Sequence, residues 1–230
     1  SAIPRSGSTL LASLLSQRPD TYVSPTSNLG EILGSVITSF YDNPATKASY
    51  SSEEELHRIL KSIIVAKYSS RNEPIIIDKG RIWPDSENIE TMKKVLGVSP
   101  KIIATVRPIA ECIASFYLVD KKSTESEKLK MPDIKSWLKT SPLMTALIDG
   151  YNALKNGYSI YPEKFCLIEY NNLCDDPQKE LDRISDFIGI EKIKYNPHIN
   201  QINENDEPWG VKDLHKLGTS IKKTEPDAQE

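Results

Sequence analysis

Several features that define large classes of protein are missing from this chain of 230 residues. No apolar run approaches the roughly 18–20 residues that a helix needs to cross a membrane, so no membrane span is expected. Lys and Arg number 29 against 32 Asp and Glu, and the net charge is −3. The chain therefore lacks the basic excess that nucleic-acid binders carry, and no nucleic-acid partner is predicted.

Cysteine and histidine are also scarce, with three of each. Cys112, Cys166 and Cys174 are odd in number, and two of them lie in expected core elements. This favours small buried side chains over a disulfide framework, and it indicates a reducing, cytoplasmic compartment. The histidines are too scattered for a recognisable metal motif, so no metal is expected.

The length fits one α/β domain over residues 1–230, with room for a large core. Short apolar segments alternate with amphipathic helical patterns, and strands are expected over 21–24, 74–78, 102–106 and 165–170. Such alternation predicts a mostly parallel central sheet with helices on both faces. Residues 121–132 are rich in Lys, Ser and Glu and predict a surface excursion.

Residues 4–11 form a pattern that is typical of anion-binding loops. They read Pro-Arg-Ser-Gly-Ser-Thr-Leu-Leu, with one arginine, one glycine and three hydroxyls before a helix expected over 7–18. Such a loop directs backbone N–H groups, hydroxyls and a cation to one place, as a phosphate or sulfate group requires. The common nucleotide loop G-x-x-x-x-G-K-[ST] is absent, since no lysine follows the single glycine. An ordinary turn that caps a helix would also fit these residues.

Two further motifs lie at the ends of expected strands. Arg107 follows the apolar run 102–106, and Ser115 lies eight residues on, about two helical turns along. Arg107 is therefore expected at the carboxyl edge of the sheet, where open α/β folds bind ligands. Tyr170 ends the strand expected at 165–170, where it also fits as an ordinary core residue.

Together these motifs resemble those of sulfotransferases that use 3′-phosphoadenosine 5′-phosphosulfate (PAPS) as sulfuryl donor. The loop resembles their 5′-phosphosulfate loop, and Arg107 with Ser115 resembles their 3′-phosphate site. The stretches 78–84 and 210–215 also resemble a sulfotransferase-like group from marine cyanobacteria and their phages. The resemblance implies a three-layer P-loop-type α/β fold, and most of the strand that leads into the loop is expected to be missing at the N-terminus.

The resemblance implies transfer of a sulfuryl group from PAPS to a hydroxyl or amine of a small-molecule, carbohydrate or peptide acceptor, without a metal. Tyr170 would lie near the adenine, and Lys216 would belong to a segment that closes over the donor. The residues assigned in this way to donor binding are Arg5, Ser6, Gly7, Ser8, Thr9, Arg107, Ser115, Tyr170 and Lys216.

Arg5, Lys79 and Glu31 are the candidates for catalysis. Arg5 and Lys79 resemble the cations that sulfotransferases place at the transferred group. Glu31 resembles the glutamate after the first helix of tyrosyl-protein sulfotransferases, and it is the first candidate for the general base, with Asp78 and His215 as rivals. For Glu31 a first-turn carboxylate that favours its helix dipole fits equally well, and for Lys79 an exposed turn residue is the alternative.

Two other functions fit parts of the sequence. A kinase-like phosphotransferase would need a Lys-[Ser/Thr] pair, which is absent, and a magnesium-holding Asp at a strand end, for which Asp78 is available. A module that binds PAP, the desulfonated nucleotide, without turnover would keep the anion loop and lose the catalytic groups.

Overall fold

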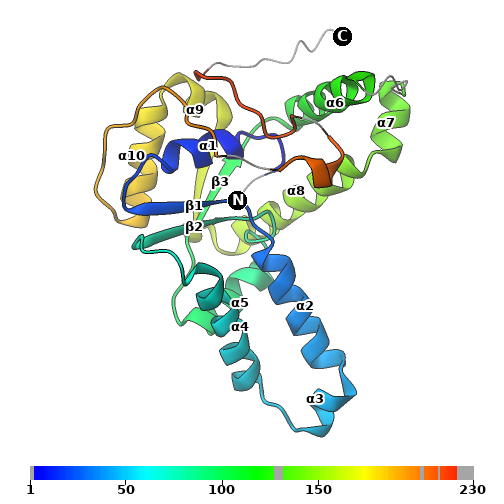
Figure 1. Ribbon diagram of the computed structural model, residues 1–230, viewed down its shortest axis with the longest axis vertical. Helices are drawn as coiled ribbons and strands as arrows, with labels where there is room; N and C mark the ends of the chain where they lie inside the picture. Colours follow the sequence, from blue (N-terminus) through cyan, green and yellow to red (C-terminus); the bar gives the residue numbers. More distant parts are fainter. Residues whose placement is uncertain (1–2, 127–131, 203–204, 212, 222–230) are drawn as a thin grey trace.

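The structure is a computed structural model that describes residues 3–126, 132–202, 205–211 and 213–221. The strands are β1 (Thr21–Thr26), β2 (Ile75–Lys79), β3 (Ile102–Val106) and β4 (Phe165–Glu169) (Figure 1). The helices are α1 (Ser8–Leu15), α2 (Leu29–Asp42), α3 (Pro44–Ala48), α4 (Glu53–Tyr68), α5 (Ser86–Leu96), α6 (Ile109–Ser126), α7 (Ile134–Thr140), α8 (Pro142–Ile160), α9 (Tyr170–Asp175) and α10 (Pro177–Ile188). None of the described helices is both long and apolar enough to cross a membrane.

The strands form two parallel pairs. β1 lies beside β2, and β3 lies beside β4 in a regular register from Ile102 opposite Phe165 to Val106 opposite Glu169. The parallel direction follows from the helical crossovers between paired strands, because parallel neighbours need such connections. The sequence predicts one central sheet, whereas the described strands make two pairs with no ladder between them.

Helices cover both faces of the β3–β4 pair. Neighbouring residues of a strand face opposite sides, so Cys166 and Ile168 pack with α1, α9 and α10, while Ala104 and Phe165 pack with α6, α7 and α8. This arrangement gives a helical layer, a β layer and a second helical layer. The α/β fold with helices on both faces is therefore confirmed.

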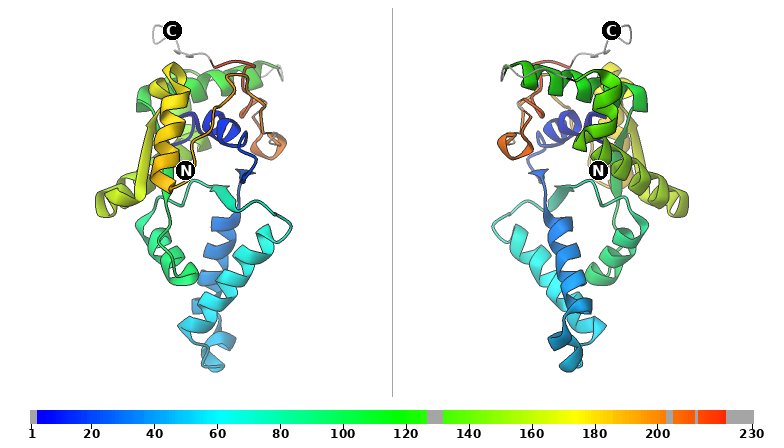
Figure 2. Two further views of the ribbon diagram at one scale, coloured as in Figure 1. Left: turned by 90° about the vertical axis from the view of Figure 1, so that its left-hand side faces the viewer. Right: turned by 90° about the vertical axis from the view of Figure 1, so that its right-hand side faces the viewer.

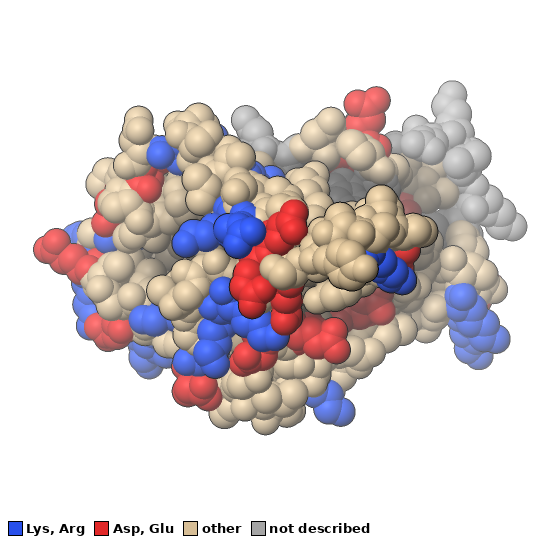
Figure 3. Space-filling model, turned by 90° about the horizontal axis from the view of Figure 1, so that it is seen from below, with Lys and Arg blue, Asp and Glu red and all other residues tan. Residues whose placement is uncertain are grey.

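A helical arm of α2, α3 and α4 projects from the β layer (Figures 1 and 2). Ser52 begins α4: its side chain accepts a hydrogen bond from the Glu55 backbone N–H at 3.2 Å and so satisfies one donor of the first turn. The buried residues that join α2, α4 and α5 are Leu29, Leu33, Leu56, Leu60 and Val95. Acidic and basic side chains alternate over the face seen in Figure 3, so this face presents no extended basic surface.

Several boundaries differ from the sequence prediction: β1 extends to Thr26 instead of ending at 24, and β2 covers Ile75–Lys79 instead of 74–78. The first helix covers Ser8–Leu15 instead of 7–18, and Tyr170 begins α9 because the chain turns into this helix directly after β4. α6 continues through Ser126, since its Lys and Glu residues favour helix and the Ser123 side chain is buried. The expected excursion at 121–132 is therefore partly helical, and residues 127–131 lie outside the described ranges.

The cysteines are free thiols, and Cys112 and Cys166 are buried in the core as the sequence predicts. Burial raises the pKa of the Cys112 thiol to about 11, so this side chain stays protonated and behaves as a small apolar group.

The turn that follows β2 packs tightly against two helices. A methyl group at Gly157 of α8 would lie 1.7 Å from the Pro84 carbonyl oxygen, and one at Gly30 of α2 would lie 2.2 Å from Ile82 Cδ1. Only glycine permits such a close approach of helix to turn. These two contacts fix the turn that carries residues 80–84.

We predict that Gly157→Ala lowers the free energy of unfolding by about 1–3 kcal/mol, because the added methyl group meets backbone that cannot move aside. Urea denaturation followed by circular dichroism measures the loss. Gly34→Ala on α2 is the matched control, since no heavy atom lies within 4 Å of its added methyl group. Unchanged stability of Gly157→Ala would show that α8 does not pack on Pro84.

Candidate active site

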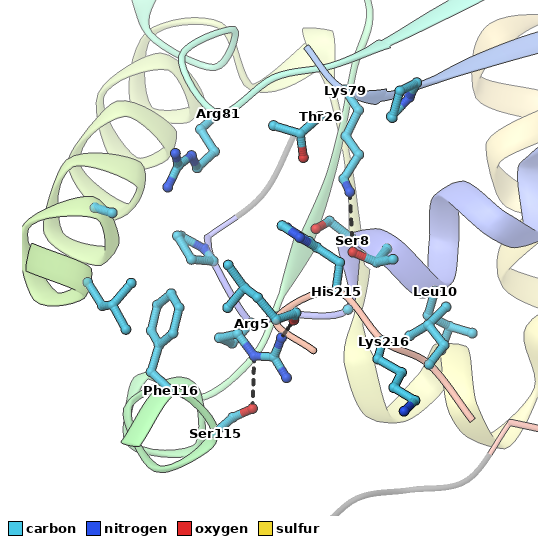
Figure 4. Close-up of a pocket in the computed structure, with 18 of the residues that line it drawn as sticks. Arg5, Ser8, Leu10, Thr26, Lys79, Arg81, Ser115, Phe116, His215 and Lys216 are labelled. Atoms are coloured by element: carbon cyan, nitrogen blue, oxygen red, sulfur yellow. Dashed lines mark hydrogen bonds between the residues drawn. The ribbon is translucent and has the colours of Figure 1, made fainter. Parts of the chain in front are cut away.

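One cavity of about 1120 Å³ brings together residues from both ends of the chain and from the strand ends (Figure 4). The predicted site residues that line it are Arg5, Gly7, Ser8, Thr9, Glu31, Lys79, Arg107, Ser115, Tyr170 and Lys216. Its other lining residues come from the end of β1, the turn after β2, the starts of α2 and α8, α6, and the described residues of the C-terminal segment, among them Asn205, Pro208 and Leu214. Ser6 is the predicted residue that does not line the cavity.

Gly7 gives the loop its shape. It precedes α1 with φ of 99°, in the left-handed region that favours glycine. A methyl group at this position would also lie 2.6 Å from Cδ2 of the Tyr170 ring. Backbone conformation and ring packing thus both require glycine, and the chain enters α1 with this helix N-terminus at the cavity.

Ser6 attaches the loop to the sheet. Its side chain is fully buried, and its hydroxyl lies 2.7 Å from Thr105 Oγ1 and donates to the Ile3 carbonyl oxygen at 2.5 Å. The side chain therefore faces the core and not the cavity. The structure gives Ser6 a positioning role in place of the expected side-chain contact with the donor.

Arg5 lines the cavity, and two hydrogen bonds hold its side chain. Its Nε donates to Ser115 Oγ at 3.1 Å, and its Nη1 donates to the Leu214 carbonyl oxygen (Figure 4). Burial, and after it the nearby Arg107 guanidinium, lower the pKa of Arg5 from its ordinary value. Loss of solvent and a like charge both disfavour the cation, so a bound anion would relieve both.

Arg107 is held on three sides. Its Nε forms a 2.8 Å ion pair with Glu111, and its guanidinium carbon lies 4.2 Å from the centre of the Tyr170 ring. Its Nη1 reaches the Arg5 carbonyl oxygen at 3.5 Å. The residue is 8% exposed and lines the cavity beside Ser115, so the two residues of the predicted 3′-phosphate site lie at one cavity.

Lys79 reaches the loop from the end of β2. Its Nζ donates to Thr9 Oγ1 at 3.2 Å, and its backbone N–H donates to Ser24 Oγ at 2.8 Å. The Lys79 carbonyl oxygen accepts from the Ser27 N–H at 2.8 Å. The strand end is thereby fixed to β1, and the ammonium group lies at the start of α1, as the sequence predicts.

Asp78 points away from this cation. Its carboxylate accepts hydrogen bonds from the Ser27 hydroxyl and the Trp83 Nε1, each at 2.6 Å, and from the Tyr68 hydroxyl. Burial and the Asp78 carboxylate raise the pKa of Tyr68, so the phenol remains a donor. Asp78 does not line the cavity. These contacts make it a structural residue and remove it as a rival base or magnesium ligand.

His215 and Glu31 approach the cavity from different segments. His215 Nδ1 lies 2.5 Å from Asp206 Oδ1, and the His215 backbone N–H donates to Asp206 Oδ2 at 3.1 Å. In the view of Figure 4 the imidazole lies between Arg5 and Lys79. Glu31 lies exposed in the first turn of α2, at the cavity wall.

Lys216 lies at the rim of the cavity. Its side chain is two-thirds exposed (67%), and its Nζ lies 3.5 Å from Asp213. Two residues of this region were not found from the sequence. Asp206 has no motif that links it to His215, whereas Arg81 has a usable signal, since it lies two residues after Lys79 and also lines the cavity. No group of His, Cys, Asp or Glu suited to a metal ion occurs within the described ranges.

Comparison with solved structures shows that the fold is that of known sulfotransferases. The fold is similar to the sulfotransferase domain from the curacin biosynthetic pathway, with a TM-score of 0.55 and 18% identity over 95% of this chain and 81% of that one. It is similar to the sulfotransferase domain of the Synechococcus PCC 7002 olefin synthase, with a TM-score of 0.53 and 16% identity over 96% and 88%. A sulfotransferase from Alicyclobacillus acidocaldarius gives 0.54 and 16% over 89% and 86%.

These identities establish the fold alone, and the sequence matches no protein with a curated description. The family assignment comes from the sequence of residues 2–194, which matches the sulfotransferase family over most of the chain. The chain therefore belongs to the sulfotransferase family.

Proposed function

We propose that the chain transfers a sulfuryl group from PAPS to a hydroxyl or amine acceptor by in-line displacement. The observation that carries this proposal is the convergence of Arg5, Lys79 and Arg107 on one cavity at the N-terminus of α1. Removing cations from solvent is costly, and a polyanionic ligand would offset that cost. The donor carries a phosphate at each end of its ribose, which suits two separated cationic positions.

The two ends of the donor have different partners in this arrangement. The loop, with Gly7 and Ser8 at the start of α1, would hold the 5′-phosphosulfate through backbone N–H groups and the helix dipole. Arg107 and Ser115 would hold the 3′-phosphate. Tyr170, packed against both Gly7 and Arg107, lies where the nucleoside would join these two groups.

In the transfer step the acceptor oxygen or nitrogen forms a bond to sulfur, and the bond between sulfur and the phosphate-bridging oxygen breaks. The electron pair leaves with PAP, so negative charge grows on the bridging oxygen. Arg5 and Lys79 are placed to stabilise this charge, because fixed donors in a dry site need no reorganisation as it develops. The acceptor proton passes to a general base.

For the base we favour His215 over Glu31. Asp206 holds Nδ1 of the imidazole and fixes the ring at the cavity, so Nε2 would be the atom that takes the acceptor proton. Glu31 lies at the exposed start of α2, and no hydrogen bond from another described residue orients its carboxylate. It keeps its place as the second candidate.

A kinase-like activity is less well supported, because the Asp78 carboxylate that could hold magnesium is taken up by three hydrogen-bond donors. A module that binds PAP without turnover has the same donor site. Calorimetric titrations with PAP and with ATP–magnesium distinguish a sulfotransferase from a kinase. Release of PAP from PAPS in the presence of an acceptor distinguishes an enzyme from a module that only binds PAP.

We predict that Arg107→Ala weakens PAP binding by about 1.5–3 kcal/mol or more, since a phosphate loses its charge-assisted partner. Calorimetry should show a much smaller effect on the nucleotide that lacks the 3′-phosphate. Equal losses for both nucleotides would place Arg107 elsewhere on the donor.

Arg5→Ala and Lys79→Ala should each lower kcat by about 10²–10³-fold at saturating PAPS, as loss of one oxyanion donor does. The double variant should lose less than the product of both effects, because the residues stabilise one developing charge. Normal kcat of Lys79→Ala would show that the lysine only holds Thr9 and the loop.

His215→Gln should lower kcat by about 10²–10⁴-fold and leave PAP affinity unchanged, because a general base acts on the acceptor proton. Glu31→Gln is the matched comparison and should retain most of the rate. The reverse pattern, a slow Glu31→Gln enzyme with normal His215→Gln turnover, would move the role to the glutamate.

A further inference from the structure

Two segments near the C-terminus, residues 196–202 and 213–221, run beside each other in opposite directions. Their backbones pair at an antiparallel bridge between His198 and Ser220. The second segment carries His215, the proposed general base, and contributes several residues to the cavity. Since the bridge lies near the far end of this segment, other contacts set the position of the imidazole.

The side chain of Gln201 continues this pairing beyond the backbone bridge. Its Nε2 donates to the His215 carbonyl oxygen at 3.0 Å, and its Oε1 accepts from the Leu217 N–H at 2.8 Å. One amide thus satisfies two backbone groups of the segment that carries the base. Gln201 does not line the cavity, so it can influence the reaction only through the residues that it holds.

The main chain of His215 is held from two sides. Its N–H donates to Asp206 Oδ2 at 3.1 Å, and its carbonyl oxygen accepts from Gln201. Asp206 also contacts the imidazole through Nδ1, and it belongs to the same C-terminal region as the histidine. Asp206 therefore sets the orientation of the ring, whereas Gln201 connects this region to another part of the chain.

Gln201 is itself fixed to the helix that begins at the anion loop. The N–H of the next residue, Ile202, donates to Ser13 Oγ at 3.3 Å, and Ser13 is fully buried in α1. Arg5 also reaches the segment, at the Leu214 carbonyl oxygen, but the proposed function engages this arginine with the donor. The hold through Gln201 lies outside the cavity and makes no such demand on the donor site.

We propose that Gln201 is a positioning residue for sulfuryl transfer: its amide holds the segment of His215 so that the imidazole meets the acceptor beside the donor. This inference rests on the proposed function, with His215 as the base. Figure 4 shows the imidazole between Arg5 and Lys79, the two cations assigned to the transferred group. A base acts only from the correct position, and a displacement of about 1 Å can cost about 10²-fold in rate.

The test replaces Gln201 by methionine, which keeps the approximate size of the side chain and removes both hydrogen bonds. With PAPS and benzyl alcohol as the probe acceptor, Gln201→Met should lower kcat by about 10–10²-fold. The affinity for PAP, measured by calorimetry, should not change. Adding Gln201→Met to His215→Gln should cause little further loss of kcat, because the base that the glutamine positions is already absent.

Gln178→Met is the matched control, because Gln178 makes the same pair of contacts away from the cavity. Its Nε2 donates to the Ile193 carbonyl oxygen at 2.9 Å, and its Oε1 accepts from the Tyr195 N–H at 3.0 Å. Both variants should lower the thermal midpoint of unfolding, and Gln178→Met should keep a normal kcat. An equal fall of kcat in both variants would overturn the inference, since it would reflect a general loss of stability.

A second readout does not depend on turnover. Nitrogen NMR of the neutral imidazoles distinguishes the two tautomers, and the signals of His215 are identified by their loss in His215→Gln. The wild-type protein should show one tautomer at His215, with the proton on Nδ1 toward Asp206. Gln201→Met should shift these signals toward a mixture of both tautomers, and Gln178→Met should leave them unchanged.

Normal kcat and unchanged His215 signals in Gln201→Met would overturn the inference. So would a loss of PAP affinity with normal kcat, which would make Gln201 a support of Lys216 and the donor. Failure of the wild-type protein to bind PAP, or to release it from PAPS, would contradict the proposed function instead. In that case the imidazole signals give the answer: a tautomer shift confined to Gln201→Met supports the positioning of His215, and its absence overturns it.

Discussion

Arg5 and Arg107 place two guanidinium groups close together, and the rest of the site depends on how their repulsion is offset. Arg5 and Arg107 repel each other and have lost much of their solvent, and Glu111 supplies one nearby negative charge. The Asp206 carboxylate, the Ser115 hydroxyl, the Leu214 carbonyl and the face of the Tyr170 ring also stabilise these cations. A protein keeps such an arrangement only if the cations have a function, because apolar residues would fill the same space at lower cost.

The carboxylate of Asp78 has a comparable importance for the geometry of the chain. The carboxylate accepts hydrogen bonds from Tyr68 at the end of α4, from Ser27 after β1 and from Trp83. These bonds fix the end of β2. The two basic residues on either side of Gly80 then point into the cavity at fixed positions. The glycine itself is needed here, since a methyl group would lie 2.7 Å from Trp83 Nε1. One acidic side chain thus positions two cations that it does not touch.

The sequence predicted those parts of the fold and site that depend on local chemistry. The loop around Gly7, the arginine after β3 and the alternation of strands and helices all follow from neighbouring residues, and the structure places Arg107 and Ser115 at one cavity with the loop. Contacts between distant residues were not predictable in this way. The hydroxyl of Ser6 faces Thr105, 99 residues away, and no local pattern distinguishes it from a side chain that faces a ligand.

The same reason explains why the sequence could not rank Asp78 and His215, the two rivals of Glu31. As a carboxylate after an apolar strand, Asp78 has the pattern of a catalytic residue, and only its partners Tyr68 and Trp83 show that it is structural. His215 is a candidate base because it contacts Asp206, and no sequence pattern predicts this contact. Arg81 was visible in the sequence, but its direction depends on how α2 and α8 hold the turn.

The hydrogen bond from Arg5 to Leu214 joins residues that are 209 positions apart, and Gln17 likewise reaches Asn196 and His198. Closing a loop of this length costs chain entropy before any contact rewards it. The arm of α2 and α4 brings together residues much nearer in the chain, so it can form early, whereas the cavity requires both ends to meet. We therefore expect the helical arm to form from local contacts before the cavity is completed.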